Sequence, residues 1–213
     1  MLSQLKIGAT LDATLSGLPE RFAERRKNPL PKEKEHYTYA DYCEWDDSER
    51  WELIDGIAYA MSPAPMWIHQ SCSMALSAKI FDFLKDKPCK VFHAPFDVRL
   101  NADEDDDTVV QPDIVVICDR SIISGTGCKG VPDMVIEILS PSTAMHDRFT
   151  KFNAYRRAGV REYWILDPET KTVNVHILTN GEYVTNVYGE DDTAPVRVLE
   201  GLTIDLKDVF AED

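Results

Sequence analysis

Three carboxylates lie inside or beside apolar segments of this 213-residue sequence, where carboxylates are uncommon. Glu52 lies in Trp-Glu-Leu-Ile, Asp113 in Pro-Asp-Ile-Val-Val-Ile, and Glu137 in Met-Val-Ile-Glu-Ile-Leu. Burying an ionised carboxylate costs several kcal/mol unless it is paired, hydrogen-bonded or bound to a metal. Any one of the three could instead point to solvent at the end of a strand. If they converge, their oxygen atoms form a ligand set that suits Mg²⁺ or Mn²⁺.

A predicted amphipathic helix over residues 144–158 follows the Glu137 segment after a short turn. Its Asp147, Lys151 and Tyr155 are spaced at i, i+4 and i+8 and therefore share one face. We expect Lys151 to lie over the carboxylates, where an ammonium group can orient a water molecule or stabilise charge on a phosphate. The alternative is that Asp147 and Lys151 form an ordinary exposed pair on the helix surface.

Arginines near this helix give a second expectation. Arg148 neighbours the shared face, and Arg156 and Arg157 lie near the end of the helix. With Lys151 they are predicted to form a local basic patch that binds nucleic acid. The alternative is that the late arginines only complement the helix dipole.

The net charge limits how nucleic acid could be bound. The chain has 23 Lys and Arg against 37 Asp and Glu, a formal charge of −14, and 44% of its residues are hydrophobic. This acidity argues against a broad basic face that coats DNA. A nuclease remains compatible with it, because a bound metal ion supplies positive charge. The acidic run Asp103–Asp107 is predicted to be a solvated loop.

The elements that must position these residues indicate a mixed α/β fold with one central β-sheet, because several strands are continuous apolar runs that need cover on both faces. Asp55-Gly56 and Asn180-Gly181 predict two β-hairpins. Helices are expected over 38–45, 67–84 and 144–158. Strands are expected over 51–54, 57–61, 90–100, 108–118, 134–139, 162–166, 172–178, 182–188 and 202–204.

The chain is predicted to consist of an N-terminal arm over residues 1–36 and one domain over 37–213. The arm has a net charge of about +2, from seven basic and five acidic residues, and contains one short amphipathic segment, Pro19–Lys27. We expect it to pack on the domain or on a partner subunit.

The five cysteines form no CxxC pair and are interpreted as reduced core thiols. Without a signal-peptide pattern or a run of 18 apolar residues, the sequence is predicted to be cytoplasmic, with no membrane partner.

The motifs, taken in order, resemble the Uma-type restriction endonuclease family of the PD-(D/E)-x-K nuclease-like superfamily, long catalogued as a domain of unknown function. The residues that carry the resemblance are Trp-Glu-Leu-Ile-Asp-Gly, Gln-Pro-Asp-Ile-Val-Val, Val-Ile-Glu-Ile-Leu-Ser-Pro-Ser-Thr, Asp-Arg-x-x-Lys-x-x-x-Tyr and Gly-Val-Arg-Glu-Tyr-Trp-Ile-Leu-Asp-Pro. Together they cover roughly Tyr37 to Phe210.

This resemblance implies a restriction-endonuclease-like core with a central mixed sheet flanked by helices. It implies an endonuclease that uses Mg²⁺ or Mn²⁺ to hydrolyse DNA phosphodiester bonds, in many cases as a homodimer. Asp113 matches the aspartate of the PD motif, Glu137 matches the following acidic residue, and Glu52 matches an additional upstream glutamate. Leu139 stands where the local lysine is usual, and Lys151 is the matching position on the next helix.

Two further residues are accessory candidates for this site. Tyr155 shares the face of Lys151, and His69 opens the predicted helix over 67–84, as a histidine often does in this family. A single histidine on a mostly apolar helix is also compatible with a structural role. Two other functions remain open: a catalytically inactive nuclease fold that acts as an interaction or nucleic-acid-binding module, and a glycosidase with two catalytic carboxylates.

Overall fold

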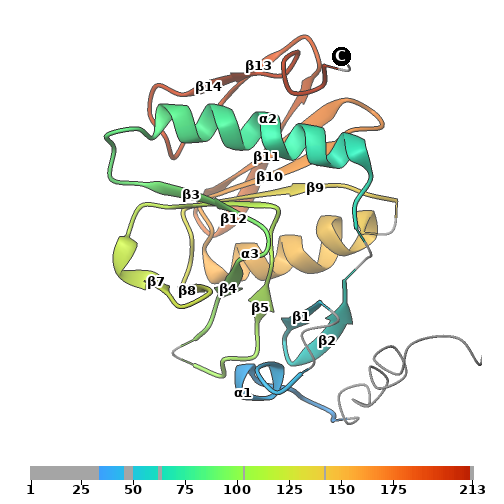
Figure 1. Ribbon diagram of the computed structural model, residues 1–213, viewed down its shortest axis with the longest axis vertical. Coiled ribbons are helices and arrows are strands. Elements are labelled where there is room, and N and C mark those ends of the chain that lie inside the picture. The colour runs from blue at the N-terminus through green and yellow to red at the C-terminus, as the bar shows by residue number, and fades with distance from the viewer. Residues whose placement is uncertain (1–33, 46–49, 62–63, 103, 142, 212–213) are drawn as a thin grey trace, which may run out of the picture. The chain divides into compact units, whose positions relative to one another are not determined.

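The computed structural model describes residues 34–45, 50–61, 64–102, 104–141 and 143–211 (Figure 1). The unit considered below is Glu35–Asp213. The predicted arm over 1–36, with its helix at Pro19–Lys27, lies outside the described residues except for its last three positions.

The central element is a six-stranded mixed sheet with the strand order β12-β11-β10-β9-β6-β3. Strands β9 and β10 are parallel, and the other neighbours are antiparallel. The mixed α/β class predicted from the sequence is confirmed. The strands are β3 (Lys90–His93), β6 (Ile114–Ile117), β9 (Met134–Ile138), β10 (Glu162–Asp167), β11 (Thr172–Thr179) and β12 (Glu182–Gly189).

Helices cover both faces of this sheet. Helix α2 (Trp67–Phe83) packs on one face through Cys72, Leu76 and Ile80, together with the C-terminal strands β13 (Thr193–Pro195) and β14 (Thr203–Asp205). The other face carries η3 (His146–Lys151), a π-helical segment that continues into α3 (Phe152–Ala158). In Figure 1, α2 and α3 lie on opposite sides of β9. Both long helices therefore occur where their apolar periodicity predicts them, because each buries its apolar side on the sheet.

Local signals in the sequence set several element boundaries correctly. Gly159, with φ of 92°, ends α3, as glycine does at many helix ends. The Asp55-Gly56 turn joins β1 (Trp51–Ile54) to β2 (Ile57–Ala60), and the Asn180-Gly181 turn joins β11 to β12. Helix α1 (Tyr39–Tyr42) begins with the expected capping box between Thr38 and Asp41, but it ends before the predicted limit at residue 45.

Beside the predicted central sheet, the structure has a second six-stranded sheet with the order β2-β1-β5-β4-β8-β7, of which the sequence predicted only the β1–β2 hairpin as a paired unit. The predicted strands over 90–100 and 108–118 are each interrupted by a proline, Pro95 and Pro112, which has no N–H for a strand ladder. The first stretch contributes β3 to the central sheet and β4 to the second sheet. The additional strands are β4 (Asp97–Arg99), β5 (Val109–Val110), β7 (Ile123–Ser124) and β8 (Gly127–Lys129).

The second sheet packs on the α3 side of the central sheet. Ile54, Val98 and Val110 belong to one buried cluster with Val135 of β9 and Tyr155 of α3. The chain passes from the second sheet to the central sheet between β5 and β6, through Gln111-Pro112-Asp113. Asp113 and its neighbours therefore lie where the two sheets meet.

The prediction that all five cysteines are reduced is wrong for one pair. Cys89 and Cys118 form a disulfide bond. They occupy the positions next to the Lys90–Ile117 pair at the end of the β3–β6 ladder, and this register brings them together. Cys43, Cys72 and Cys128 are free. Among the described residues, no helix combines the length and hydrophobicity needed to cross a bilayer.

Candidate active site

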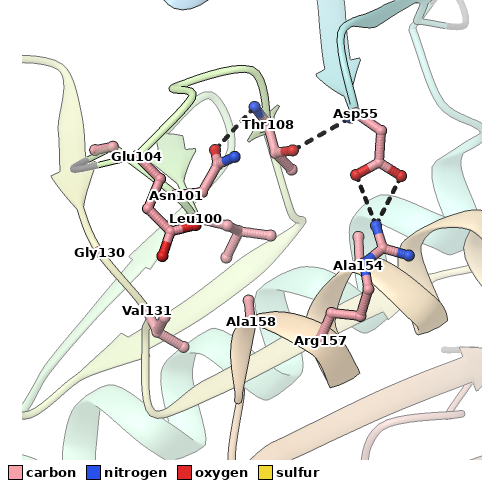
Figure 2. A pocket seen from close by; sticks show the side chains of 11 residues that line it. Asp55, Leu100, Asn101, Glu104, Thr108, Gly130, Val131, Ala154, Arg157 and Ala158 are labelled. Carbon is pink, nitrogen blue, oxygen red and sulfur yellow. Dashed lines mark hydrogen bonds and ion pairs between the residues drawn. The ribbon is translucent and has the colours of Figure 1, made fainter.

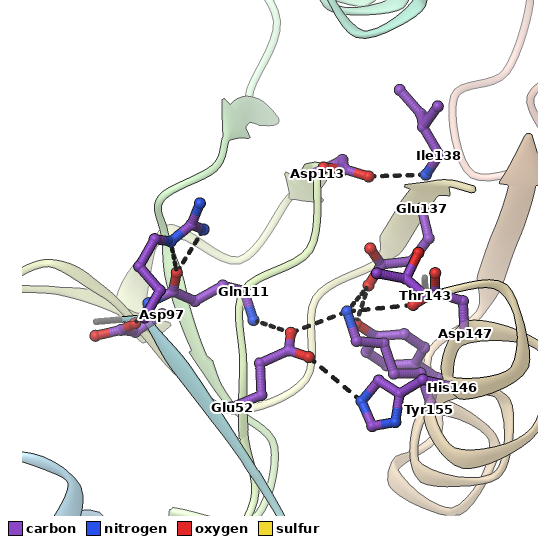
Figure 3. Close-up of polar contacts among 12 residues, drawn as sticks. Glu52, Asp97, Gln111, Asp113, Glu137, Ile138, Thr143, His146, Asp147 and Tyr155 are labelled. Carbon is purple, nitrogen blue, oxygen red and sulfur yellow. Dashed lines mark hydrogen bonds and ion pairs between the residues drawn. The ribbon is translucent and has the colours of Figure 1, made fainter. Parts of the chain in front are cut away.

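The register of two central strands places Asp113 beside Glu137. The antiparallel β6–β9 ladder ends at the pair Ile114–Ile136, and the next positions along it are Asp113 and Glu137. The backbone N–H of Ile138 donates to Asp113 Oδ2 at 2.8 Å, which holds the Asp113 carboxylate against β9 (Figure 3). Two carboxylates far apart in sequence are thus neighbours at one end of a buried ladder.

Glu52 approaches from the second sheet. On β1, Leu53 points into the cluster formed with Tyr37 and Val109, whereas Ile54 belongs to the cluster that contains Tyr155. Because side chains alternate along a strand, Glu52 shares the face of Ile54, toward α3. The backbone N–H of Gln111 donates to Glu52 Oε1 at 2.8 Å and fixes the carboxylate there.

Lys151 lies among three carboxylates. Its Nζ is 2.9 Å from Glu52 Oε1, 2.9 Å from Glu137 Oε1 and 3.5 Å from Asp147 Oδ1. All four side chains are buried. The alternative in which Asp147 and Lys151 form an exposed helix pair is therefore wrong. We call Glu52, Asp113, Glu137, Asp147 and Lys151 the carboxylate–lysine cluster.

The helix that supplies Lys151 also supplies two other contacts. Tyr155 OH donates to Glu137 Oε1 at 2.8 Å, so the predicted accessory tyrosine does meet the cluster. Asp147 and Lys151 both belong to η3, and π-helical turns inside α-helices are frequent at functional sites. Tyr163 OH, on β10, donates to the backbone oxygen of Asp147 at 3.1 Å and ties η3 to the central sheet.

Two histidines contact carboxylates of the cluster. His69, in the first turn of α2, places Nε2 3.2 Å from Asp113 Oδ2, and its Nδ1 is buried with no hydrogen-bond partner among the described groups. His146 places Nε2 3.4 Å from Glu52 Oε2, without the alignment of a hydrogen bond. His69 could be identified from the sequence, whereas His146 could not, because a single histidine beside Asp147 has no ligand spacing.

The environment separates the pKa values of the two glutamates. Burial alone would raise the pKa of Glu52, but the charge of Lys151, with the nearby His146 and the Gln111 N–H, outweighs it and lowers that pKa to about 2. Burial raises the pKa of Glu137 well above its usual value; Lys151 opposes this, and the charges of Asp147, Asp113 and Glu52 add to it. Burial would lower the pKa of Lys151, but the surrounding carboxylates raise it well above normal. Lys151 is therefore charged, and Glu137 tends to keep its proton.

The cluster is suited to a hard divalent cation. Three buried carboxylates contact Lys151, and Asp113 lies beside Glu137. An excess of negative charge in such a cluster is unfavourable unless a cation offsets it. The donors are all oxygen atoms, which Mg²⁺ and Mn²⁺ prefer. Within the described ranges, no three Asp, Glu, His or Cys side chains are spaced as a ready metal-ligand group. Mg²⁺ commonly needs only one or two carboxylates, with water and phosphate completing its shell. The neighbouring pair Asp113 and Glu137 fits that requirement.

The predicted basic patch does not form as a surface of free cations. Lys151 is buried. The three arginines each meet a carboxylate from a different element: Arg148 pairs with Asp167, Arg156 with Glu182, and Arg157 with Asp55. Their role in nucleic-acid binding stays a prediction.

A pocket of about 520 Å³ lies away from the cluster, between the loop after β4 and the end of α3 (Figure 2). The Arg157–Asp55 ion pair closes one side of it. None of the five cluster residues lines this pocket.

Glu52 gives a prediction about stability and pH. Since its pKa is lowered to about 2 in the folded state, its stabilising contribution is present above pH 4.5 and is lost as the pH falls toward 2. The difference in unfolding free energy between the wild type and Glu52→Gln should shrink by roughly 3 kcal/mol over that range. Urea unfolding between pH 2.5 and 7 measures it, and a difference independent of pH would contradict the assignment.

Comparison with known proteins adds three findings. The family model Uma2, described as a putative restriction endonuclease, matches residues 38–207. An uncharacterized protein of Synechocystis, slr1290, is 27% identical over 175 residues, which cover 80% of this chain and 88% of that protein. The crystal structure of a putative nuclease belonging to DUF820 from Anabaena variabilis matches with a TM-score of 0.67 and 22% identity, covering 82% of this chain and 97% of that one. This last similarity shows a shared fold.

Proposed function

This chain belongs to the Uma2 restriction endonuclease family, and from that premise we propose that it is a divalent-metal-dependent endonuclease that hydrolyses phosphodiester bonds in DNA. The observation that supports the proposal most strongly is the Lys151 ammonium, 2.9 Å from both Glu52 and Glu137 in a buried cluster. A lysine and several carboxylates held together are what hydrolysis of a charged diester needs.

Asp113 and Glu137 are the residues that would hold Mg²⁺ or Mn²⁺, with Glu52 as a third carboxylate beside them. When bound, such an ion acidifies water and offsets charge on the phosphate. The side chain of Asp113 is about one-fifth exposed, whereas the side chains of Glu52 and Glu137 are 4% exposed. Asp113 is therefore the part of the cluster that substrate can reach first. His69 and the Ile138 N–H keep it oriented.

Lys151 is proposed to do the work of the lysine that is absent at position 139. Glu137 and Leu139 lie two residues apart and therefore face the same side of the sheet, and Leu139 is buried there in the apolar cluster. The helix that packs on this side of the sheet brings Lys151 to Glu137. Its ammonium would donate to the attacking water or to a phosphate oxygen as negative charge develops. Tyr155 fixes Glu137 by donating to Oε1, the Glu137 oxygen that Lys151 also contacts.

The proposal is tested by incubating the purified protein with supercoiled plasmid, single-stranded DNA and flapped DNA in Mn²⁺, Mg²⁺ or EDTA. We expect cleavage in the divalent metals and none in EDTA. A homodimer, which we also propose, would cut both strands in one encounter, whereas a monomer would accumulate nicked plasmid.

Asp113→Asn should lower the cleavage rate by about a hundredfold or more, since it removes a metal ligand. Asp133→Asn is the matched control. Asp113 directly precedes β6 and accepts a hydrogen bond from the Ile138 backbone N–H. Asp133 directly precedes β9 and accepts one from the Cys118 backbone N–H. Asp133 lies at the opposite end of the β6–β9 ladder from Asp113. Cleavage in EDTA, or equal cleavage by the two variants, would contradict the proposal. A stable protein that neither binds metal nor cuts any of these substrates would favour the inactive interaction module.

A further inference from the structure

A nuclease with this acidic cluster needs a cation at its rim, because the substrate backbone is itself negatively charged. Most arginines that the structure describes already pair with carboxylates. These are Arg99, Arg148, Arg156, Arg157 and Arg161. A phosphate approaching any of them competes with an existing ion pair.

Arg50 is different, and it lies beside the cluster. It directly precedes β1 and is exposed. The backbone N–H of Met61 donates to Arg50 O at 2.9 Å, which continues the β1–β2 ladder by one position. Arg50 therefore has strand geometry and, two residues before Glu52, points to the same face of the second sheet.

The hydrogen bonds of Arg50 with the described residues go to a neutral acceptor. Its Nε and Nη2 donate to Gln111 Oε1 at 2.9 and 2.6 Å. This acceptor is a neutral amide, and among the residues that the structure describes no carboxylate forms an ion pair with Arg50. A guanidinium has five N–H donors, so several remain for the oxygen atoms of a phosphate.

Gln111 connects this arginine to the cluster. Its Nε2 donates to Tyr42 OH and to Asp97 Oδ1, both at 2.9 Å, so its side chain is held from both ends. Its backbone N–H donates to Glu52 Oε1 (Figure 3), and it stands two residues before Asp113. The guanidinium is thus fixed in one orientation before substrate arrives, which lowers the entropy lost on binding.

We propose that Arg50, held by Gln111, binds a backbone phosphate of the nucleic-acid strand next to the scissile one, and that Gln111 is the residue that positions it. This inference rests on the proposed function, because it assigns a substrate contact to the same site. It adds a binding role to residues outside the carboxylate–lysine cluster.

The test measures binding of a labelled DNA oligonucleotide by fluorescence anisotropy in Ca²⁺ at several salt concentrations, and steady-state cleavage in Mn²⁺. Arg50→Ala should weaken binding about tenfold at constant salt and reduce the slope of log affinity against log salt by about 0.7–0.9. KM should rise while kcat stays within about twofold. Arg50→Lys should recover the salt slope, because a lysine retains the charge.

Arg120→Ala is the matched control. Arg120 is also exposed, and its Nε and Nη2 also donate to neutral oxygens, the carbonyls of Pro88 and Lys87, beyond the far end of β6. It should leave affinity and slope unchanged. An unchanged slope in Arg50→Ala, an equal effect of Arg120→Ala, or a change in kcat alone would overturn the inference. DNA binding that depends on Arg50 in a protein that cuts nothing in Mn²⁺ would support the phosphate contact and refute the nuclease function.

Discussion

Replacing Lys151 with methionine should lower the free energy of unfolding by about 3–5 kcal/mol at pH 7, because removal of one partner leaves buried charges uncompensated. Glu52, Glu137 and Asp147 all lie within 3.5 Å of Nζ and are almost fully buried. Urea unfolding measures the loss. The same variant should also lose cleavage activity, since it removes the ammonium group that lies 2.9 Å from both Glu52 and Glu137.

Two conditions should partly restore the stability of Lys151→Met. Lowering the pH toward 5 allows the carboxylates to take up protons, and burial already raises the pKa of Glu137 and of Asp147. A group whose pKa is raised on folding favours the folded state at low pH, so the unfolding free energy should increase as the pH falls. Millimolar Mn²⁺ should do the same by placing positive charge among the carboxylates.

Lys79→Met is the control for this substitution. Lys79 pairs with Asp208 at 2.6 Å, but both side chains are substantially exposed, and exposed pairs contribute roughly 0–1 kcal/mol. Equal destabilisation by the two variants, or no response of Lys151→Met to pH and Mn²⁺, would contradict the electrostatic account of the cluster.

Glu137→Gln should lower the cleavage rate by about a thousandfold or more, because it removes a proposed metal ligand, a carboxyl group that can give up its proton to bind the ion. The fold should tolerate the change. Burial raises the pKa of Glu137 well above normal, so the carboxyl is inclined to keep a proton, and the glutamine amide has the same size. Its oxygen can still accept from Tyr155 and Lys151. We expect unfolding free energy to change by no more than about 1 kcal/mol.

Most of the site could be predicted from the sequence because its members are chemically out of place. Glu52 and Glu137 are single carboxylates in apolar strands, and their burial requires a partner. The helical spacing of Asp147, Lys151 and Tyr155 identified that partner. Leu139 belongs to the apolar core, and the match of Lys151 to the lysine that is missing there came from the resemblance to the Uma-type family.

The rest of the site depends on tertiary contacts that no local pattern encodes. The second sheet arises where Pro95 and Pro112 interrupt predicted strands, and this crossover is what brings Glu52 to the central sheet. Whether an arginine is free or paired depends on carboxylates distant in sequence: Arg157 meets Asp55, 102 positions away. The role of Arg50 follows only from its contact with Gln111, 61 positions away.

The acidic loop also contains tertiary contacts that its sequence pattern does not predict. Asp103–Asp107 was predicted to be solvated, and Glu104 and Asp105 are exposed. Asp107 is buried, however, because Asn101 and Thr108 donate to its carboxylate and His36 lies 3.2 Å from it. A run of like charges predicts the average environment of its members, and individual hydrogen bonds decide the exceptions.

A second buried glutamate provides the control that the central claim requires. Glu162 lies on β10, next to β9, and is fully buried. It accepts from Trp164 Nε1 at 2.7 Å and from the Val198 backbone N–H at 2.8 Å, on the α2 side of the sheet. Burial raises its pKa, as it does for Glu137. The two glutamates therefore share burial and a raised pKa, and they differ in the face of the sheet on which they lie.

The most direct test is the ratio of single-turnover DNA cleavage rates of Glu162→Gln and Glu137→Gln in Mn²⁺. We predict that Glu162→Gln cuts within about threefold of the wild-type rate while Glu137→Gln is slower by about a thousandfold or more. Equal rates for the two variants, with the wild type active, would contradict the assignment of the carboxylate–lysine cluster as the active site.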